Sequence, residues 1–251
     1  MELPGIRYTK TEINKIRESN RIVAEVHKEL KGMLVAGIAT SQIDKEAFKI
    51  IKSFGGEPAF KGYRGFPFTT CISVNDTIVH GFPSKHSLKE KDLVSVDVGV
   101  VKDGYYGDAC FSVVIGNNEK AQRLVDATHG CLESVITTIR DGVTTGDIGE
   151  FIESYGTQYG YGVVKDFVGH SIGCVLHDNP PIKNYGRSRF GFVLKADMVI
   201  CIEPMFIEGS AEHIKEKNGW EIKTKDGGLA AHAEHCVLIT NSGYEILSQL
   251  P

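Results

Sequence analysis

The sequence of 251 residues predicts an α+β domain made of two similar halves that fold about a pseudo-twofold axis. Three observations predict this class. An alternating apolar stretch at 93–110 carries two acids and turns back on itself, as a β-hairpin does. Two helical patterns followed by strand-like segments occur in the same order twice. Four residues also recur at an offset of 105: Gly37/Gly142, Thr40/Thr145, Ile43/Ile148 and Gly55/Gly160.

We expect the halves to cover roughly residues 1–115 and 116–251 of one domain, 1–251, because no Pro-, Gly- or Ser-rich linker separates them. The net charge of −4 gives no electrostatic footprint for nucleic acid or an anionic membrane. The six cysteines form no CxxC pair. The N-terminus lacks a signal-peptide core, and no apolar run approaches the roughly 18 residues of a membrane span. We therefore expect a cytoplasmic protein in a reducing compartment.

In the first half, Thr9 and Glu12 form a capping box that predicts the start of a helix, and Gly32 predicts its end. A second helix is expected over residues 40–54, up to a glycine pair. A glycine-punctuated, β-rich segment follows, with His80 at the end of a strand.

The predicted hairpin places two acids on one face of a sheet. Its turn, Asp103-Gly104, suits the two positive-φ positions of a type I′ turn. This turn sets two cross-strand pairs: Asp97 with Cys110, and Gly99 with Asp108. The two aspartates are then diagonal neighbours with Cα atoms about 7–8 Å apart. Since two carboxylates about 4 Å apart repel by about 4 kcal/mol at an effective dielectric constant of 20, we expect a positive group between them.

The second half repeats this order. Helices are expected at Asn118–Ile139 and Thr145–Tyr159, and strand-like segments at 163–177, 196–206 and 219–240. Two acids again fall in strands. Glu203 lies 106 residues after Asp97, and Glu234 follows a second Asp-Gly turn.

Four acids and one histidine form the candidate site: Asp97, Asp108, Glu203, Glu234 and His170. Hard oxygen ligands with one imidazole suit a pair of first-row divalent ions. Two ions about 3.5–4 Å apart also need bridging carboxylates. Spacing alone does not fix this set. Solvated acids on an exposed sheet face, and an ordinary turn at GHSIG, are the alternatives.

Taken together, the motifs resemble one family, the type I methionine aminopeptidases of the short bacterial form. The matching motifs run in the family's order from Phe60 to His235: FKGYRGFP, CISVND, VHGFP, VDVGVVKDGYYGD, VGHSIGCVLHDNP, IEPM, GWEIKTKDG and EH. Asp97 and Asp108 meet the family's D-x10-D spacing. The resemblance implies the pita-bread fold: pseudo-twofold duplicated α/β halves with a central curved antiparallel sheet and helices on its outer face.

The resemblance also implies a role for each ligand candidate. Asp97 would hold one divalent ion, His170 and Glu203 the other, and Asp108 and Glu234 would bridge the pair. Four carboxylates would balance two dications, and cobalt, manganese, iron and zinc all suit the set. A water activated by the ions would attack the peptide bond after the N-terminal methionine, with Glu203 as proton acceptor.

Further matches imply how substrate is held. His177 would donate a hydrogen bond to the scissile carbonyl oxygen, and His80 would assist departure of the new amine. An apolar methionine slot would be lined by four side chains: Tyr63, Phe66, Cys71 and Trp220. A thioether among rings and sulfur gains up to about 1.5 kcal/mol per contact. The adjoining site would admit only a small second residue.

Several positions depart from the family pattern: Ser171, Leu176, Ala233 and the Ala109-Cys110 pair. None of them removes a ligand. Loss of aromatic rings at Leu176 and Ala233 is expected to widen the pocket and relax the preference for methionine.

The implied function is removal of the initiator methionine from nascent polypeptides by a cytoplasmic monomer that contacts the ribosome transiently and binds neither nucleic acid nor membranes directly. Two other readings stay open here. An X-Pro exopeptidase of the same fold would use the same five ligands, although such enzymes usually carry an extra N-terminal domain. A non-enzymatic pita-bread domain that binds protein or RNA should have lost a ligand, and this chain keeps all five.

Overall fold

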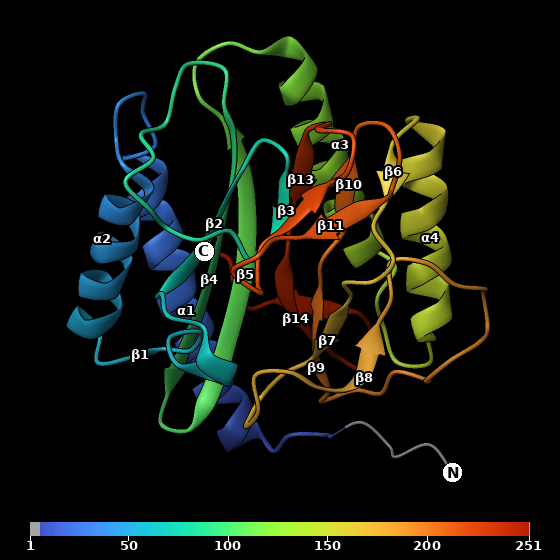
Figure 1. The fold of residues 1–251 in the computed structure, drawn as a ribbon. Coiled ribbons are helices and arrows are strands. Elements are labelled where there is room, and N and C mark those ends of the chain that lie inside the picture. Colours follow the sequence, from blue (N-terminus) through green and yellow to red (C-terminus); the bar gives the residue numbers. More distant parts are fainter. Residues whose placement is uncertain (1–5, 251) are drawn as a thin grey trace.

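The computed structural model describes residues 6–250 (Figure 1). Each half begins with two helices and continues with strands. The elements of the first half are α1 (Lys10–Lys31), α2 (Thr40–Ser53), β1 (Glu57–Pro58), the 3-10 turn η1 (Tyr63–Gly65), β2 (Thr70–Val74), β3 (Thr77–Val79), β4 (Leu93–Lys102) and β5 (Tyr105–Val114). Those of the second half are α3 (Glu119–Ile136), α4 (Thr145–Gln158), β6 (Gly162–Val163), β7 (Gly169–Ser171), β8 (Asp178–Ile182), β9 (Val199–Ile202), β10 (Met205–Ile207), β11 (His213–Lys215), β12 (Ile222–Thr224), β13 (Ala230–His232), β14 (His235–Ile239) and β15 (Tyr244–Ile246). No helix within these residues has the length and apolar character that crossing a membrane requires.

The two halves repeat at the offset found in the sequence. Helices α2 and α4 each have 14 residues and begin at Thr40 and Thr145, 105 positions apart. The short strands β1 and β6 that follow them are also 105 apart, at Glu57 and Gly162. They pair with β4 and β10 respectively. The predicted duplicated α+β fold is therefore confirmed. The boundary near residue 115 and the single catalytic domain stay predictions.

Local sequence explains where the helices begin and end. The Thr9 hydroxyl accepts the Glu12 N–H at 3.4 Å, and the Glu12 carboxylate accepts the Thr9 N–H at 2.8 Å, which completes the predicted capping box. Helix α3 ends at Ile136, three residues before the predicted end at Ile139. Its last turn tightens because the amides of Thr138 and Ile139 bond carbonyls only three residues back.

Strands β4 and β5 form the predicted hairpin. Both turn residues, Asp103 and Gly104, have positive φ, at 51° and 78°. The observed register pairs Asp97 with Cys110 and Gly99 with Asp108, as predicted. Strands β1 and β2 pair with the opposite edge of β4, so β4 lies inside a four-stranded sheet.

The second half forms a five-stranded sheet in the order β15-β14-β9-β7-β8 and a smaller one, β13-β10-β6. Glu203 lies in the break between β9 and β10, and Glu234 in the break between β13 and β14. A third sheet, β11-β12-β3, joins the two halves. An isolated bridge between Cys110 and Glu234 joins them again, so β5 meets the segment between β13 and β14.

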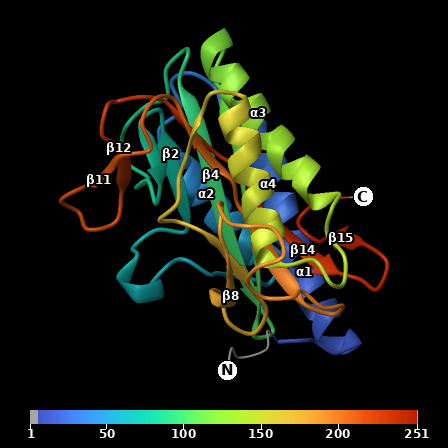
Figure 2. The same cartoon turned by 90° about the vertical axis from the view of Figure 1, so that its right-hand side faces the viewer.

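The helices pack on the sheets from one side (Figures 1 and 2). Apolar side chains of α1 and α2 bury against β4 and β5, and those of α3 and α4 bury against strands of the second half. Each fully buried aliphatic side chain contributes about 1.5–3 kcal/mol. Strands β11 and β12 extend at the left of Figure 2, away from α3 and α4. The sheet face opposite the helices is thus left for the candidate site.

Candidate metal centre and substrate cavity

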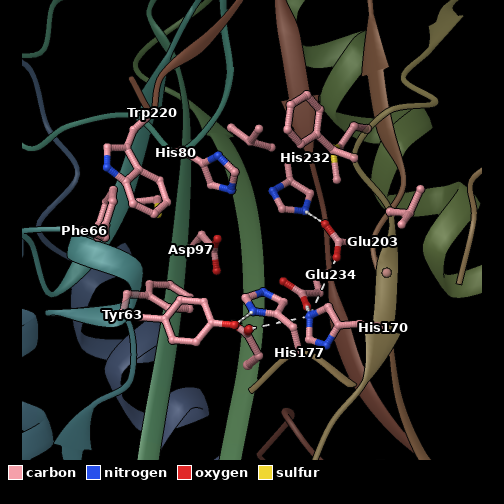
Figure 3. Close-up of a pocket in the computed structure, with 18 of the residues that line it drawn as sticks. Tyr63, Phe66, His80, Asp97, His170, His177, Glu203, Trp220, His232 and Glu234 are labelled. Atoms are coloured by element: carbon pink, nitrogen blue, oxygen red, sulfur yellow. Dashed lines mark hydrogen bonds and ion pairs between the residues drawn. The ribbon is translucent and has the colours of Figure 1, made fainter. Parts of the chain in front are cut away.

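One cavity of about 380 Å³ contains every candidate residue (Figure 3). The five predicted ligands lie in its floor, and the predicted substrate residues form its walls. The candidates that line it are Tyr63, Phe66, Cys71, His80, Asp97, Asp108, His170, His177, Glu203, Trp220 and Glu234. They come from both halves of the chain, from η1 to the β13–β14 break.

The hairpin register brings Asp97 and Asp108 to the cavity from the first half. Because Asp97 lies opposite Cys110, two residues beyond Asp108, both carboxylates emerge on the same sheet face. Carboxylate oxygens of Asp97, Asp108 and Glu234 all lie within 4.8 Å of one another. Asp108 and Glu234 are only 2% and 3% exposed, so no bulk water separates these charges.

His170 is held with one ring nitrogen turned toward the acids. Its Nδ1 lies 3.0 Å from the carbonyl oxygen of Ser171, which can only accept, so Nδ1 donates and Nε2 carries the free lone pair. That Nε2 lies 3.9 Å from Asp108 Oδ2, 3.9 Å from Glu203 Oε1 and 4.0 Å from Glu234 Oε1. Three oxygens thus surround the nitrogen at nearly one distance.

These atoms fit divalent ions. An ion bound about 2.0–2.1 Å from an imidazole nitrogen would fill the space between Nε2 and the facing oxygens. Three buried carboxylate oxygens also have no hydrogen-bond partner: Asp97 Oδ1, Asp108 Oδ1 and Glu234 Oε1. A buried anionic oxygen without a partner is costly. The donor set, four carboxylates and one imidazole, suits first-row divalent cations.

The pKa values of the acids reflect the same crowding. Burial, followed by repulsion from Glu234 and Asp97, raises the pKa of Asp108 well above its ordinary value. Burial and the neighbouring Glu203 and Asp97 do the same for the pKa of Glu234, and the pKa of Asp97 rises to about 7. Burial would also raise the pKa of Glu203, but the close contact with the His232 imidazole holds the pKa of Glu203 below its ordinary value. Glu203 is therefore the acid best stabilised as a carboxylate.

Both predicted substrate histidines face the cavity. His177 Nδ1 lies 3.0 Å from the Tyr63 hydroxyl, and the rings of His177 and His170 are 4.4 Å apart. His80 follows β3 with φ of 59°, a left-handed conformation that is uncommon for a residue other than glycine. Its ring contacts Phe167 and Trp220 edge-on. The aromatic neighbours fix its position in a backbone conformation that its own side chain disfavours.

An apolar wall faces the acids. The Phe66 ring meets Trp220 edge-to-face at 5.2 Å and Phe82 at 5.4 Å. Cys71 is the cross-strand partner of Asp97 and forms the lower edge of this wall. Rings in edge-to-face contact hold their shape, so the wall is a preformed slot beside the charged floor.

The structure also places residues in the cavity that the sequence did not single out. The nearest to the acids is His232, whose Nε2 lies 3.4 Å from Glu203 Oε2. Phe167 and Met205 line the cavity as well. A period-2 pattern places His232 on the same strand face as Glu234, and that signal alone pointed to it. Leu176 and Ala233 are buried and do not line the cavity. Whether the missing aromatic rings widen the pocket stays a prediction.

Comparison with known proteins decides the family. Residues 14–241 match the profile of metallopeptidase family M24. The chain belongs to this family. This M24 metallopeptidase is 40% identical over 240 residues to the methionine aminopeptidase of Clostridium acetobutylicum, covering 95% of this chain and 96% of the relative.

Solved structures agree. The methionine aminopeptidase of Thermotoga maritima superposes on this M24 metallopeptidase with a TM-score of 0.97 at 39% identity, over 98% of this chain and 100% of that one. The prolidase of Pyrococcus horikoshii has a TM-score of 0.80 at 22% identity, over 98% of this chain and 64% of its own, and shares the fold. The predicted pita-bread fold is thereby confirmed, as is dependence on divalent metal.

Proposed function

We propose that this chain is a methionine aminopeptidase that hydrolyses the N-terminal methionine from peptides and nascent proteins. One observation carries the proposal: four carboxylates and an imidazole converge on the floor of a cavity whose facing wall is an apolar slot of aromatic rings and sulfur. The floor supplies hydrolytic chemistry, and the slot supplies a place for a long thioether side chain. Similarity over nearly the full length of methionine aminopeptidases supports the same activity.

We assign the metal ligands as Asp97, Asp108, His170, Glu203 and Glu234. The even spacing of oxygens around His170 Nε2 and the unpartnered carboxylate oxygens support this assignment. When bound, a pair of divalent ions would supply Lewis acidity and a water of lowered pKa. The four carboxylates match the charge of two dications, which supports a dinuclear site.

The remaining residues bind and orient the substrate. Glu203, the acid held ionised, accepts the proton that the attacking water loses. His177 lies beside His170 and donates a hydrogen bond to the scissile carbonyl oxygen, with Tyr63 fixing its ring through the 3.0 Å contact. His80 faces the departing amine from the opposite wall (Figure 3). Phe66, Cys71 and Trp220 exclude water around the methionine side chain.

The cellular setting is also part of the proposal. The scattered cysteines support a reducing, cytoplasmic setting. With the activity we also propose a monomer that meets nascent chains at the ribosome transiently. Size-exclusion chromatography with light scattering tests the oligomeric state. Co-sedimentation with ribosomes at low and physiological salt tests the contact.

Peptide hydrolysis tests the activity itself. The protein, stripped of metal and reloaded separately with cobalt, manganese, iron or zinc, is offered Met-Gly-Met and an X-Pro peptide. Release of free methionine only after metal is restored is the expected result. Cleavage of the X-Pro peptide alone would replace this proposal with that of a prolidase-type exopeptidase, the fold relative with 22% identity.

A further inference from the structure

His232 stands out among the cavity residues because none of the ligand or substrate roles includes it. We propose that His232 is a positioning residue that holds Glu203 in the orientation needed for metal binding and proton transfer. It lies on β13, is 3% exposed, and turns its ring into the cavity beside Glu203 (Figure 3). The inference rests on the proposed function of the same site.

The two oxygens of the Glu203 carboxylate are divided between two histidines. Oε1 faces His170 Nε2 at 3.9 Å, across the space for an ion. Oε2 faces His232 Nε2 at 3.4 Å. His232 Nε2 has no other polar partner, and because a carboxylate only accepts, an N–H at Nε2 is the group that can donate toward Oε2. His232 therefore fixes the outer oxygen and leaves the inner oxygen free for the ion.

The pseudo-symmetry explains why an imidazole stands here. In the first half Gly99 pairs with Asp108, and in the second half Met205 pairs with His232. Gly99 and Met205 are 106 positions apart, as are Asp97 and Glu203. His232 thus occupies the place that Asp108 has in the first half. A carboxylate there would repel Glu203, whereas an imidazole N–H stabilises it.

The backbone of His232 is anchored by the first half. Ser112 Oγ donates to the His232 carbonyl at 2.7 Å and accepts the His232 N–H at 3.1 Å. Ser95 Oγ lies 2.7 Å from Ser112 Oγ and completes a buried hydroxyl pair. A group that orients a metal ligand works only when it is itself held. The two Ser112 contacts hold the His232 backbone across the boundary between the halves, and Ser95 steadies Ser112 within the first half.

Two substitutions test whether the polar contact of His232 with Glu203 matters beyond the packing of its ring. His232→Leu removes the donor, and His232→Gln keeps an amide N–H at similar reach. We expect His232→Leu to weaken Mn²⁺ binding, measured by calorimetric titration of the apoprotein, by roughly 10–100-fold, the usual effect of losing such a partner. We also expect kcat on Met-Gly-Met to fall with KM little changed, because the slot is untouched. His232→Gln should restore both values toward the wild type.

His86 provides the matched control, since it is exposed and lies outside the cavity. His86→Leu and His86→Gln should bind Mn²⁺ as the wild type does. Wild-type Mn²⁺ affinity and kcat in a folded His232→Leu protein would overturn the inference, as would equal impairment of the Leu and Gln variants. If His232→Leu fails to fold, Ser112→Ala keeps the imidazole but loosens it. A smaller loss of Mn²⁺ affinity would support the inference, and no loss would overturn it.

The two proposals fail in different ways. Mn²⁺ titration needs no substrate, so it tests His232 even if the protein cleaves no peptide. A wild-type protein that binds Mn²⁺ but releases no methionine would remove the proposed function alone.

Discussion

The backbones of Cys110 and Glu234 hydrogen bond to each other where the two halves meet: the Glu234 N–H donates to the Cys110 carbonyl at 2.9 Å, and the Cys110 N–H to the Glu234 carbonyl at 3.3 Å. The two residues are equivalent in their halves. Cys110 and Glu234 are 124 positions apart in the sequence, as are Val114 and Leu238. Val114 pairs with β4 in the first half, and Leu238 pairs with β9 in the second half. The pseudo-twofold axis therefore passes between them, directly below the cavity.

Glu203→Gln tests the proton acceptor. The amide preserves shape and one oxygen but loses the charge that coordinates metal and accepts a proton. Loss of a positioned acid–base group costs roughly 10²–10⁴-fold, so kcat on Met-Gly-Met should fall by at least this much while the far-UV circular dichroism stays unchanged. Unchanged turnover would remove Glu203 from the reaction.

Asp97→Asn tests the ligand set. Asp97 would hold one ion of the pair, so elemental analysis of the dialysed variant should give fewer bound metal ions per chain than the wild type. Asp103→Asn, in the exposed turn of the same hairpin, is the control and should match the wild type. Equal metal content in both variants would mean that the β4 acid binds no ion.

Gly107→Ala tests the close packing of β5 on α1. A Cβ at Gly107 would lie 2.6 Å from the backbone nitrogen of Asn20, and that backbone cannot swing aside as a side chain can. We expect the free energy of unfolding in urea to fall by about 1–3 kcal/mol. At Gly243 a Cβ would meet nothing within 4 Å, so Gly243→Ala should leave stability nearly unchanged. Similar values for the two variants would contradict the packing argument.

Asp147→Asn tests stability against pH. Burial alone would raise the pKa of Asp147, but hydrogen bonds from Ser188, Thr144 and Arg189 hold it well below its ordinary value of 3.8. Because the folded pKa is lowered, the stabilisation is present above pH 3.8 and is lost as the pH falls through the folded pKa.

The Asn variant should therefore be less stable than the wild type by about 1–2 kcal/mol at neutral pH, the usual loss for a charged hydrogen bond. Urea unfolding over a pH series should show this difference shrinking below pH 3.8. Glu46→Gln, at a surface ion pair, is the control and should change stability by about 0–1 kcal/mol. A difference for Asp147 that does not depend on pH would contradict the assignment.

The hairpin could be predicted to the residue because its information is local. Asp103-Gly104 sets the turn, the turn sets the register, and the register places Asp97 and Asp108 on one face. The capping box at Thr9 is equally local, and helix α1 begins where it indicates.

What could not be predicted depends on contacts between segments far apart in the sequence or on the path of the chain. His232 lies near Glu203 only because β13 pairs with β10 and Ser112 anchors it from the first half. The segment 163–177 looked strand-like throughout, yet beyond the end of β6 only Gly169–Ser171 forms a strand. The residues after it turn out of the sheet to bring His177 over His170. The sequence pattern shows apolar content there but not the path of the chain.

The proposed ligands come from both halves, which meet at Cys110 and Glu234, so bound ions would hold the two halves together. Neither half alone carries all five proposed ligands, so the ions would bind and stabilise only the folded chain. Each tenfold rise in free ion concentration above the dissociation constant would add about 1.4 kcal/mol per site to the free energy of unfolding. A chelator that removed the ions would restore the mutual repulsion of the four carboxylates. The contact between the two halves should therefore weaken first.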